Sequence, residues 1–193
     1  MKKILILYCI LAMNIVNAQK NIVLNINTGF PITSSGSRNF YIESSINKSV
    51  FKNIFLGIGL NYSKIDSKPT NNLLTYDRKT INYYISLGNS FTTKNSVIEF
   101  SPQVKIGYSL YSYSLNEFVT KRQSDNGFFA APGVVVKYKL NDKLFINTQV
   151  FYNTIFNSYK NNIDITIPAN YITTQEKYIG EFNVGLGVTI KLY

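Results

Sequence analysis

The sequence predicts an all-β fold: a single up-and-down antiparallel transmembrane β-barrel of about eight strands, preceded by a cleaved N-terminal signal peptide. Three observations lead to this prediction. Apolar and polar residues alternate along successive segments, the connections between them alternate in length, and the first residues resemble an export signal. The 15 Tyr and 13 Phe residues also favour strands.

Residues 1–18 are predicted to be the signal peptide. Two lysines precede an apolar run over residues 4–16, which is shorter than the roughly 20 residues that a membrane-spanning helix needs. Small residues follow, so cleavage is expected between Ala18 and Gln19. The mature chain, residues 19–193, would then form one outer-membrane barrel domain.

Each alternating segment is close to the roughly 9–11 residues that a tilted transmembrane strand requires. In the first segment, Leu24 and Ile26 alternate with Asn25 and Asn27, so one face suits lipid and the other a polar interior. The predicted strands are residues 22–30, 40–47, 54–62, 81–88, 98–110, 128–139, 144–152 and 178–192.

The connections between these strands alternate between short and long. The short ones are residues 48–53, 92–96 and 141–143, and the long ones are residues 31–39, 63–78, 116–126 and 157–175. Short periplasmic turns and long external loops are typical of outer-membrane barrels. Because an unpaired strand edge is costly in hydrocarbon, the first and last strands are expected to pair.

Two prolines interrupt predicted strands. Pro102 and Pro132 each lack the N–H group that a β-ladder uses. Each is therefore expected to lie at a bulge or at a strand end.

The inward faces of the predicted strands carry both glycines and bulky or charged residues. The glycines would make room for large side chains, so we expect a filled interior rather than a wide pore. Acidic and basic side chains would form a structural polar network inside the barrel. Its predicted members are Glu43, Glu99, Lys105, Lys137 and Glu181.

Repeated Gly-x-Gly strands such as residues 57–59, together with the closing segment 185–193, resemble the small outer-membrane β-barrels of Gram-negative envelopes, the PorT-like and OmpX/OmpA-like barrels. This resemblance implies an integral outer-membrane protein whose terminal aromatic residue, here Tyr193, is read by the barrel-assembly machinery. The PorT-like resemblance further implies a role in a secretion apparatus.

The composition argues against catalysis. The chain has no histidine, which removes the usual general base and the commonest metal ligand. Its one cysteine, Cys9, lies within the predicted signal peptide, so no thiol nucleophile or zinc–thiolate site is expected in the mature chain. We therefore expect no enzymatic activity, no cofactor and no metal.

The formal net charge of +10 would suit an anionic partner. Export and the scattered arrangement of the basic residues argue against nucleic acid. The expected partners are outer-membrane lipid and lipopolysaccharide, the barrel-assembly machinery, and a surface or secretion-apparatus protein.

Binding is expected in the external loops, which gives the protein a structural or surface-interaction role in adhesion or secretion. The candidate contact residues are Tyr76, Arg78, Lys121, Arg122, Tyr159, Lys160 and Tyr171. Two alternatives remain open. One is a soluble periplasmic carrier of an apolar ligand, similar to a lipocalin, and the other is a narrow channel for ions or small solutes.

Overall fold

The computed structural model describes residues 22–32, 39–51, 53–67, 76–93, 97–115, 123–157 and 178–192. These residues form strands joined in a single sheet. The predicted signal peptide, its cleavage site and Tyr193 lie outside the described residues. The described residues include no helix with the length and apolar character needed to cross a bilayer.

The strands are longer than the sequence pattern alone predicts, because the ladders extend into the segments expected to be loops. Their bounds are β1 Ile22–Ile32, β2 Asn39–Phe51, β3 Ile54–Ser67, β4 Tyr76–Asn89, β5 Phe91–Thr92, β6 Ile98–Leu115, β7 Gln123–Lys139, β8 Leu144–Asn157 and β9 Tyr178–Lys191.

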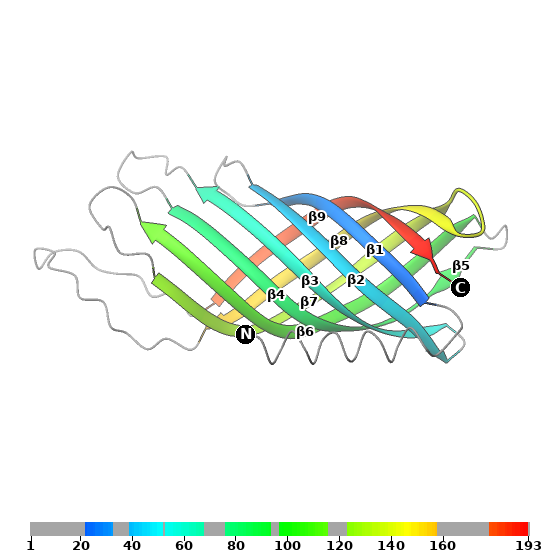
Figure 1. Cartoon of the computed structure of the whole chain (residues 1–193), viewed down its shortest axis with the longest axis horizontal. Helices are drawn as coiled ribbons and strands as arrows, with labels where there is room; N and C mark the ends of the chain where they lie inside the picture. The colour runs from blue at the N-terminus through cyan, green and yellow to red at the C-terminus, as the bar shows by residue number, and fades with distance from the viewer. Residues whose placement is uncertain are drawn as a thin grey trace, which may run out of the picture.

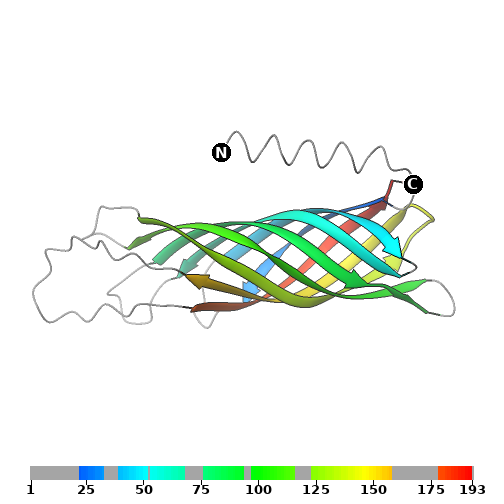
Figure 2. The same cartoon turned by 90° about the horizontal axis from the view of Figure 1, so that it is seen from below.

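The sheet closes on itself into a barrel. Each long strand pairs antiparallel with its neighbours in the order β4-β3-β2-β1-β9-β8-β7-β6, and β4 also pairs with β6. The two-residue strand β5 pairs with β6 in the same register as β4 does. It is therefore a continuation of β4 after a short break. The predicted eight-stranded antiparallel barrel is thus confirmed, including the pairing of the first and last strands, β1 and β9. Figures 1 and 2 show these strands running obliquely to the long axis.

Side chains alternate between a buried inner face and an exposed outer face, as the sequence pattern predicts. In β1, Asn25 and Asn27 are buried whereas Ile26 and Phe30 are exposed. Along β9, Asn183 is buried between the exposed side chains of Phe182 and Val184. The barrel therefore has an apolar outer wall and a largely polar interior.

Aromatic side chains are exposed near both ends of the outer wall. Phe40 and Tyr62 pack together near the long connections, with ring centroids 5.9 Å apart, and Tyr152 and Phe182 do the same at 4.9 Å. Near the short turns the exposed aromatic residues are Phe51, Phe91, Phe100 and Tyr138. Two aromatic rims of this kind are typical of barrels that cross a bilayer.

The prolines are accommodated in two different ways. Pro102 lies opposite the break between β4 and β5, since the β4–β6 ladder ends at the pair Gly88–Gln103 and resumes at Phe91–Phe100. Pro102 itself lies within β6, which continues past it and pairs it with Val134 of β7. The strand end predicted at Pro102 is therefore found in the neighbouring strand β4, and not in the strand that contains the proline. Pro132 interrupts the β7–β8 ladder between Ala130–Thr154 and Gly133–Phe151 without any change of register. The expectation of a bulge or strand end at Pro132 is therefore wrong: the ladder loses hydrogen bonds locally and then continues.

The ends of the segments predicted to be long loops belong to strands. Pro31 is within β1 and Arg78 is within β4. β1 ends at Ile32 and β2 begins at Asn39, whereas β3 ends at Ser67 and β4 begins at Tyr76. The barrel wall therefore continues further toward the long connections than the alternation of apolar residues indicated.

A lysine in the middle of the outer wall should destabilise the barrel in a bilayer. Ile85 is 57% exposed and pairs with Ile58 and Ile106, far from both strand ends. We expect Ile85→Lys to lower the free energy of unfolding in phospholipid vesicles by ~2–4 kcal/mol, because the ammonium group would face hydrocarbon.

The matched control is Ile54→Lys at the start of β3, where the outer wall reaches the short turns. There the expected cost is ~0–1 kcal/mol, because a charge near the interface can reach water. Equal costs for the two variants, measured by denaturant unfolding from vesicles, would contradict a hydrocarbon-facing wall.

Candidate functional site in the barrel interior

The interior is filled by side chains from all the long strands. Large aromatic residues are fully enclosed there, among them Tyr41, Phe129 and Phe151. They alternate with buried amides and hydroxyls, such as Asn61, Ser86 and Thr189. An eight-stranded barrel is only wide enough for its side chains, which explains this dense filling.

Glycines make room for the bulk of Tyr41. Gly29 of β1 and Gly185 of β9 lie directly opposite each other. A Cβ atom at Gly185 would lie 1.9 Å from the Tyr41 hydroxyl oxygen, and one at Gly29 would lie 2.8 Å from Tyr41 Cε1 and 2.1 Å from the Val184 carbonyl oxygen. The Tyr41 ring therefore needs glycine at both positions, and its hydroxyl oxygen accepts a hydrogen bond of 2.9 Å from Gln149 Nε2.

Three ion pairs succeed one another along the barrel axis. Near the long connections, the Arg78 guanidinium of β4 contacts the Glu181 carboxylate of β9, across the barrel. At mid-height, Lys105 Nζ lies 2.7 Å from Glu43 Oε2.

Near the short turns, Lys137 Nζ of β7 lies 2.5 Å from Glu99 Oε1 of β6. These two residues face each other directly in the β6–β7 ladder. The Arg78–Glu181 and Lys105–Glu43 pairs connect strands that are not neighbours. They therefore also link opposite walls of the barrel.

The central pair is surrounded by further polar and aromatic groups. Asn61 Nδ2 donates to Glu43 Oε2 at 3.4 Å, and Asn82 Nδ2 donates to Asn61 Oδ1 at 3.3 Å. The Lys105 ammonium also lies 3.4 Å from the centroid of the Phe151 ring. Buried charges need such compensation, because an uncompensated charge in a protein interior costs several kcal/mol.

A second chain of hydrogen bonds runs across the seam where the barrel closes. Asn147 Nδ2 donates to Thr189 Oγ1 at 2.8 Å, and Thr189 Oγ1 donates to Asn25 Oδ1 at 2.7 Å. Asn25 Nδ2 in turn donates to Ser45 Oγ at 3.2 Å. This chain links β8, β9, β1 and β2, so side chains reinforce the backbone pairing of the first and last strands.

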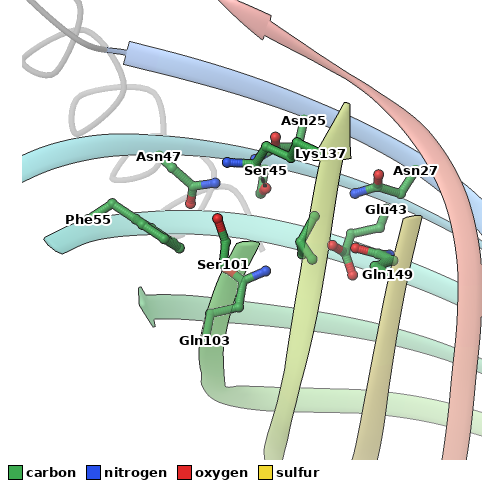
Figure 3. A pocket seen from close by; sticks show the side chains of 11 residues that line it. Asn25, Asn27, Glu43, Ser45, Asn47, Phe55, Ser101, Gln103, Lys137 and Gln149 are labelled. Carbon is green, nitrogen blue, oxygen red and sulfur yellow. Dashed lines mark hydrogen bonds between the residues drawn. The ribbon is translucent and has the colours of Figure 1, made fainter. Parts of the chain in front are cut away.

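The described interior side chains leave an inner cavity and an outer one. The inner one measures about 10 Å³ and is bordered by the polar groups shown in Figure 3. Asn27 Oδ1 and Gln149 Oε1 line it and accept no hydrogen bond from the described protein atoms. A cavity of this size is at the lower limit for a single water molecule. The outer cavity, of about 280 Å³, lies at the short-turn end.

The structure places all five residues of the predicted polar network inside the barrel. It brings Glu43 to Lys105 and Glu99 to Lys137, and it pairs Glu181 with Arg78. Arg78 was expected to be a loop contact, and this expectation is wrong. The residue is 4% exposed in β4, where its guanidinium neutralises a buried carboxylate.

The inward position of Arg78 could have been recognised from the sequence. It continues the alternation that Asn82 and Thr80 set along β4, so it belongs to the same inward face. The charged segment around it concealed this pattern. Tyr76 begins β4. The remaining candidate contacts and both cleavage residues lie outside the described residues: Lys121, Arg122, Tyr159, Lys160, Tyr171, Ala18 and Gln19.

The interior chemistry is that of paired charges and amides. Across the described strands and turns, no three His, Cys, Asp or Glu side chains come together in a way that could hold a metal ion. The described carboxylates of the interior each face a cationic partner. This arrangement holds the barrel together.

No protein-family profile and no characterised protein matches the sequence. Solved structures do resemble the fold. Neisserial surface protein A has a TM-score of 0.56 at 14% identity, covering 90% of this chain and 100% of that chain. A major outer membrane protein from Thermus thermophilus has a TM-score of 0.55 at 11% identity, covering 89% and 98%.

The N-terminal β-barrel domain of Pseudomonas aeruginosa OprF has a TM-score of 0.53 at 11% identity, covering 89% of this chain and 97% of that chain. At such identities the similarity concerns the fold. The chain therefore has the same fold as these small outer-membrane β-barrels.

Removing one partner of the central ion pair should be costly. We expect Glu43→Gln to lower the free energy of unfolding by ~3–5 kcal/mol, because it leaves the enclosed Lys105 ammonium without its counter-charge. The double variant Glu43→Gln/Lys105→Met should be more stable than Glu43→Gln alone, since both charges are then absent.

The control is Asp142→Asn, which breaks the exposed Lys139–Asp142 pair of 2.7 Å in the turn after β7. A hydrogen bond from Lys139 and the charge of Lys139 lower the pKa of Asp142, but the carboxylate is fully in water. Its loss should leave the denaturation midpoint unchanged within error. An equally mild effect of Glu43→Gln would show that the interior pair is unimportant.

Proposed function

We propose that this protein is an integral outer-membrane barrel whose interior acts as a structural plug, and that its biological role is structural or lies in surface interaction, in adhesion or secretion, without catalysis. The observation that carries this proposal is the combination of an apolar outer wall with a closed, charge-paired interior.

The outer wall supports the membrane location. Large apolar side chains are exposed around the whole barrel, for example Ile42, Ile85, Ile106, Ile146 and Leu186. Soluble monomers rarely expose a continuous apolar surface of this extent, because contact with water makes it prone to aggregation. In a bilayer the same surface is solvated by lipid chains, and the closed ladder leaves no backbone edge in hydrocarbon.

The interior argues against the soluble carrier that the sequence left open. A lipocalin-like protein would have an apolar cavity inside and a polar surface outside. Here the polarity is the reverse: Asn147, Gln149 and Glu43 are buried, whereas Ile146 and Val150 are exposed. A small apolar ligand would find no apolar cavity among the described interior residues.

The narrow interior also weighs against the channel. The inner cavity of about 10 Å³ offers no continuous aqueous path. Conduction would require the Glu43–Lys105 pair and its neighbours to separate. A plugged barrel is therefore the better-supported interpretation.

Export, assembly and partners belong to the same proposal. We expect the signal peptide to be cleaved after Ala18, the barrel-assembly machinery to insert the chain, and outer-membrane lipid and lipopolysaccharide to surround it. A PorT-like association with a secretion apparatus is the most specific part, and it rests on the sequence resemblance alone. Any contact with a surface partner would involve the long connections.

Electrophoretic mobility tests the membrane barrel. After carbonate washing, we expect the protein to stay in the outer-membrane fraction and to migrate faster on SDS gels unheated than boiled, because a closed barrel resists detergent and remains compact. A carbonate-soluble protein without a heat-dependent shift would reject the membrane assignment.

Planar bilayers test the plug. We expect the reconstituted protein to give no stepwise conductance at neutral pH, because side chains fill the lumen. The double variant Phe151→Gly/Tyr41→Gly serves as the comparison, since it removes two fully enclosed aromatic rings from the lumen. Regular steps from the unmodified protein would favour the channel instead.

A further inference from the structure

The mouth of the barrel at the short-turn end contains a cavity that the plug does not fill. It measures about 280 Å³, close to the lower end of the range for small-molecule sites. Residues from β1, β2, β3, β6, β7 and β9 line it, together with the turn after β2 and the β4–β5 junction. The lining shares Asn47, Phe55 and Lys137 with the small inner cavity, which begins directly beneath it.

The charges around this mouth do not cancel. Glu99 and Lys137 both line the cavity, and they neutralise each other at 2.5 Å. The third charged residue of the lining is Lys191 of β9. Its ammonium lies 4.6 Å from the centroid of the Phe145 ring, and it takes part in none of the ion pairs found among the described residues.

The position of Lys191 is fixed by the fold. Its backbone N–H donates to the Lys143 carbonyl oxygen at 2.8 Å, and its Cα pairs with that of Val23 in the closing ladder. The ammonium lies over the ring of Phe145, a residue that is 3% exposed. The Glu99 carboxylate attracts the Lys191 ammonium through space, but its close ion pair is with Lys137. An incoming anion at the wall of this cavity can therefore pair with Lys191 without breaking a close ion pair.

Neutral hydrogen-bonding groups complete the lining. Ser90 and Thr92 lie on the side contributed by β4 and β5, and Ser90 Oγ lies 3.1 Å from Ser101 Oγ, where either atom could donate. Asn47 and Asn53 contribute amides. Hydroxyl and amide donors beside an ammonium are the groups that bind carboxylate and phosphate oxygens.

From this lining we infer that the short-turn mouth is a binding site for a small solute that carries an oxyanion, a carboxylate or a phosphate, with Lys191 as its charge partner. The excess positive charge selects the sign of the ligand, and the cavity volume limits its size. This inference concerns one end of the barrel and does not depend on the membrane location or on the role of the long connections.

Nuclear magnetic resonance of the refolded full-length protein in a maltoside detergent tests this site, because such a detergent contains neither phosphate nor carboxylate. Inorganic phosphate is titrated at constant ionic strength against chloride, and acetate is titrated in a second arm. We expect amide shifts at Lys191, Ser90 and Thr92 that saturate in the millimolar range, on the order of 1 mM. Saturation with only one of the two probes identifies which oxyanion the site prefers.

Variants of Lys191 decide whether the site is specific. Lys191→Gln should weaken the binding of the effective probe by about tenfold or more, the effect of losing one charge-assisted hydrogen bond. Lys191→Arg keeps the charge and should retain most of the affinity. Lys143→Gln, in the exposed turn nearby, should change the affinity by less than about twofold, because salt in the surrounding water screens an exposed charge.

Unchanged amide shifts along β3 in each variant would verify that the barrel has kept its fold. The inference is overturned if neither probe gives saturating shifts, if the shifts are spread over all exposed lysines, or if Lys191→Gln binds as tightly as the unmodified protein. A barrel that failed the electrophoretic test of membrane insertion could still bind phosphate here, so the two proposals fail separately.

Discussion

In hydrocarbon, the backbone N–H and C=O groups of the barrel wall need hydrogen-bond partners within the wall. The pairing of β1 with β9 closes the sheet and supplies these partners for the first and last strands. The ladder runs from Val23–Lys191 to Ile32–Phe182, and Leu192 N donates to the Ile22 carbonyl oxygen at 2.8 Å beyond its end. Without this seam, two strand edges would face hydrocarbon, where each unsatisfied group costs several kcal/mol. Closure gives every strand an inner and an outer side, and the alternation of polar and apolar residues decides which residues face inward.

Closure at eight strands leaves an interior that side chains must fill, and this explains why glycines and aromatic rings occur together there. The Tyr41 ring occupies space that side chains at Gly29 and Gly185 would otherwise take. Charges are tolerated in the same space because they are paired across it, as in Arg78–Glu181. The interior therefore contributes contacts between opposite walls that the backbone ladders cannot provide. At the short-turn mouth the described side chains leave a cavity unfilled, and Lys191 lies beside it.

The fold could be predicted from local patterns, whereas the contacts of the interior could not. Apolar and polar residues alternate with a period of two along each strand. The inward placement of Glu43 and Glu99 could therefore be predicted from the sequence. Which residues meet across the lumen depends on the tilt and stagger of the whole barrel, which no single strand encodes. The partner of Glu181 is Arg78, a residue that the sequence analysis placed in a loop, so this ion pair could not be predicted. Pro132 was also misjudged, since the β7–β8 ladder passes it without a change of register.

The most direct test of this account is to determine whether the outer face of one strand is in contact with lipid. Spin labels attached to single cysteines on the outer face of β3, at Leu56, Ile58 and Leu60, would be measured in vesicles. A label at Asp142, in the exposed turn after β7, serves as the control in water. We expect the three β3 labels to be accessible to oxygen dissolved in the bilayer and shielded from a water-soluble nickel complex. The label at position 142 should be accessible to the nickel complex. Accessibility of the β3 labels to the nickel complex would contradict a lipid-facing wall, and with it the membrane barrel.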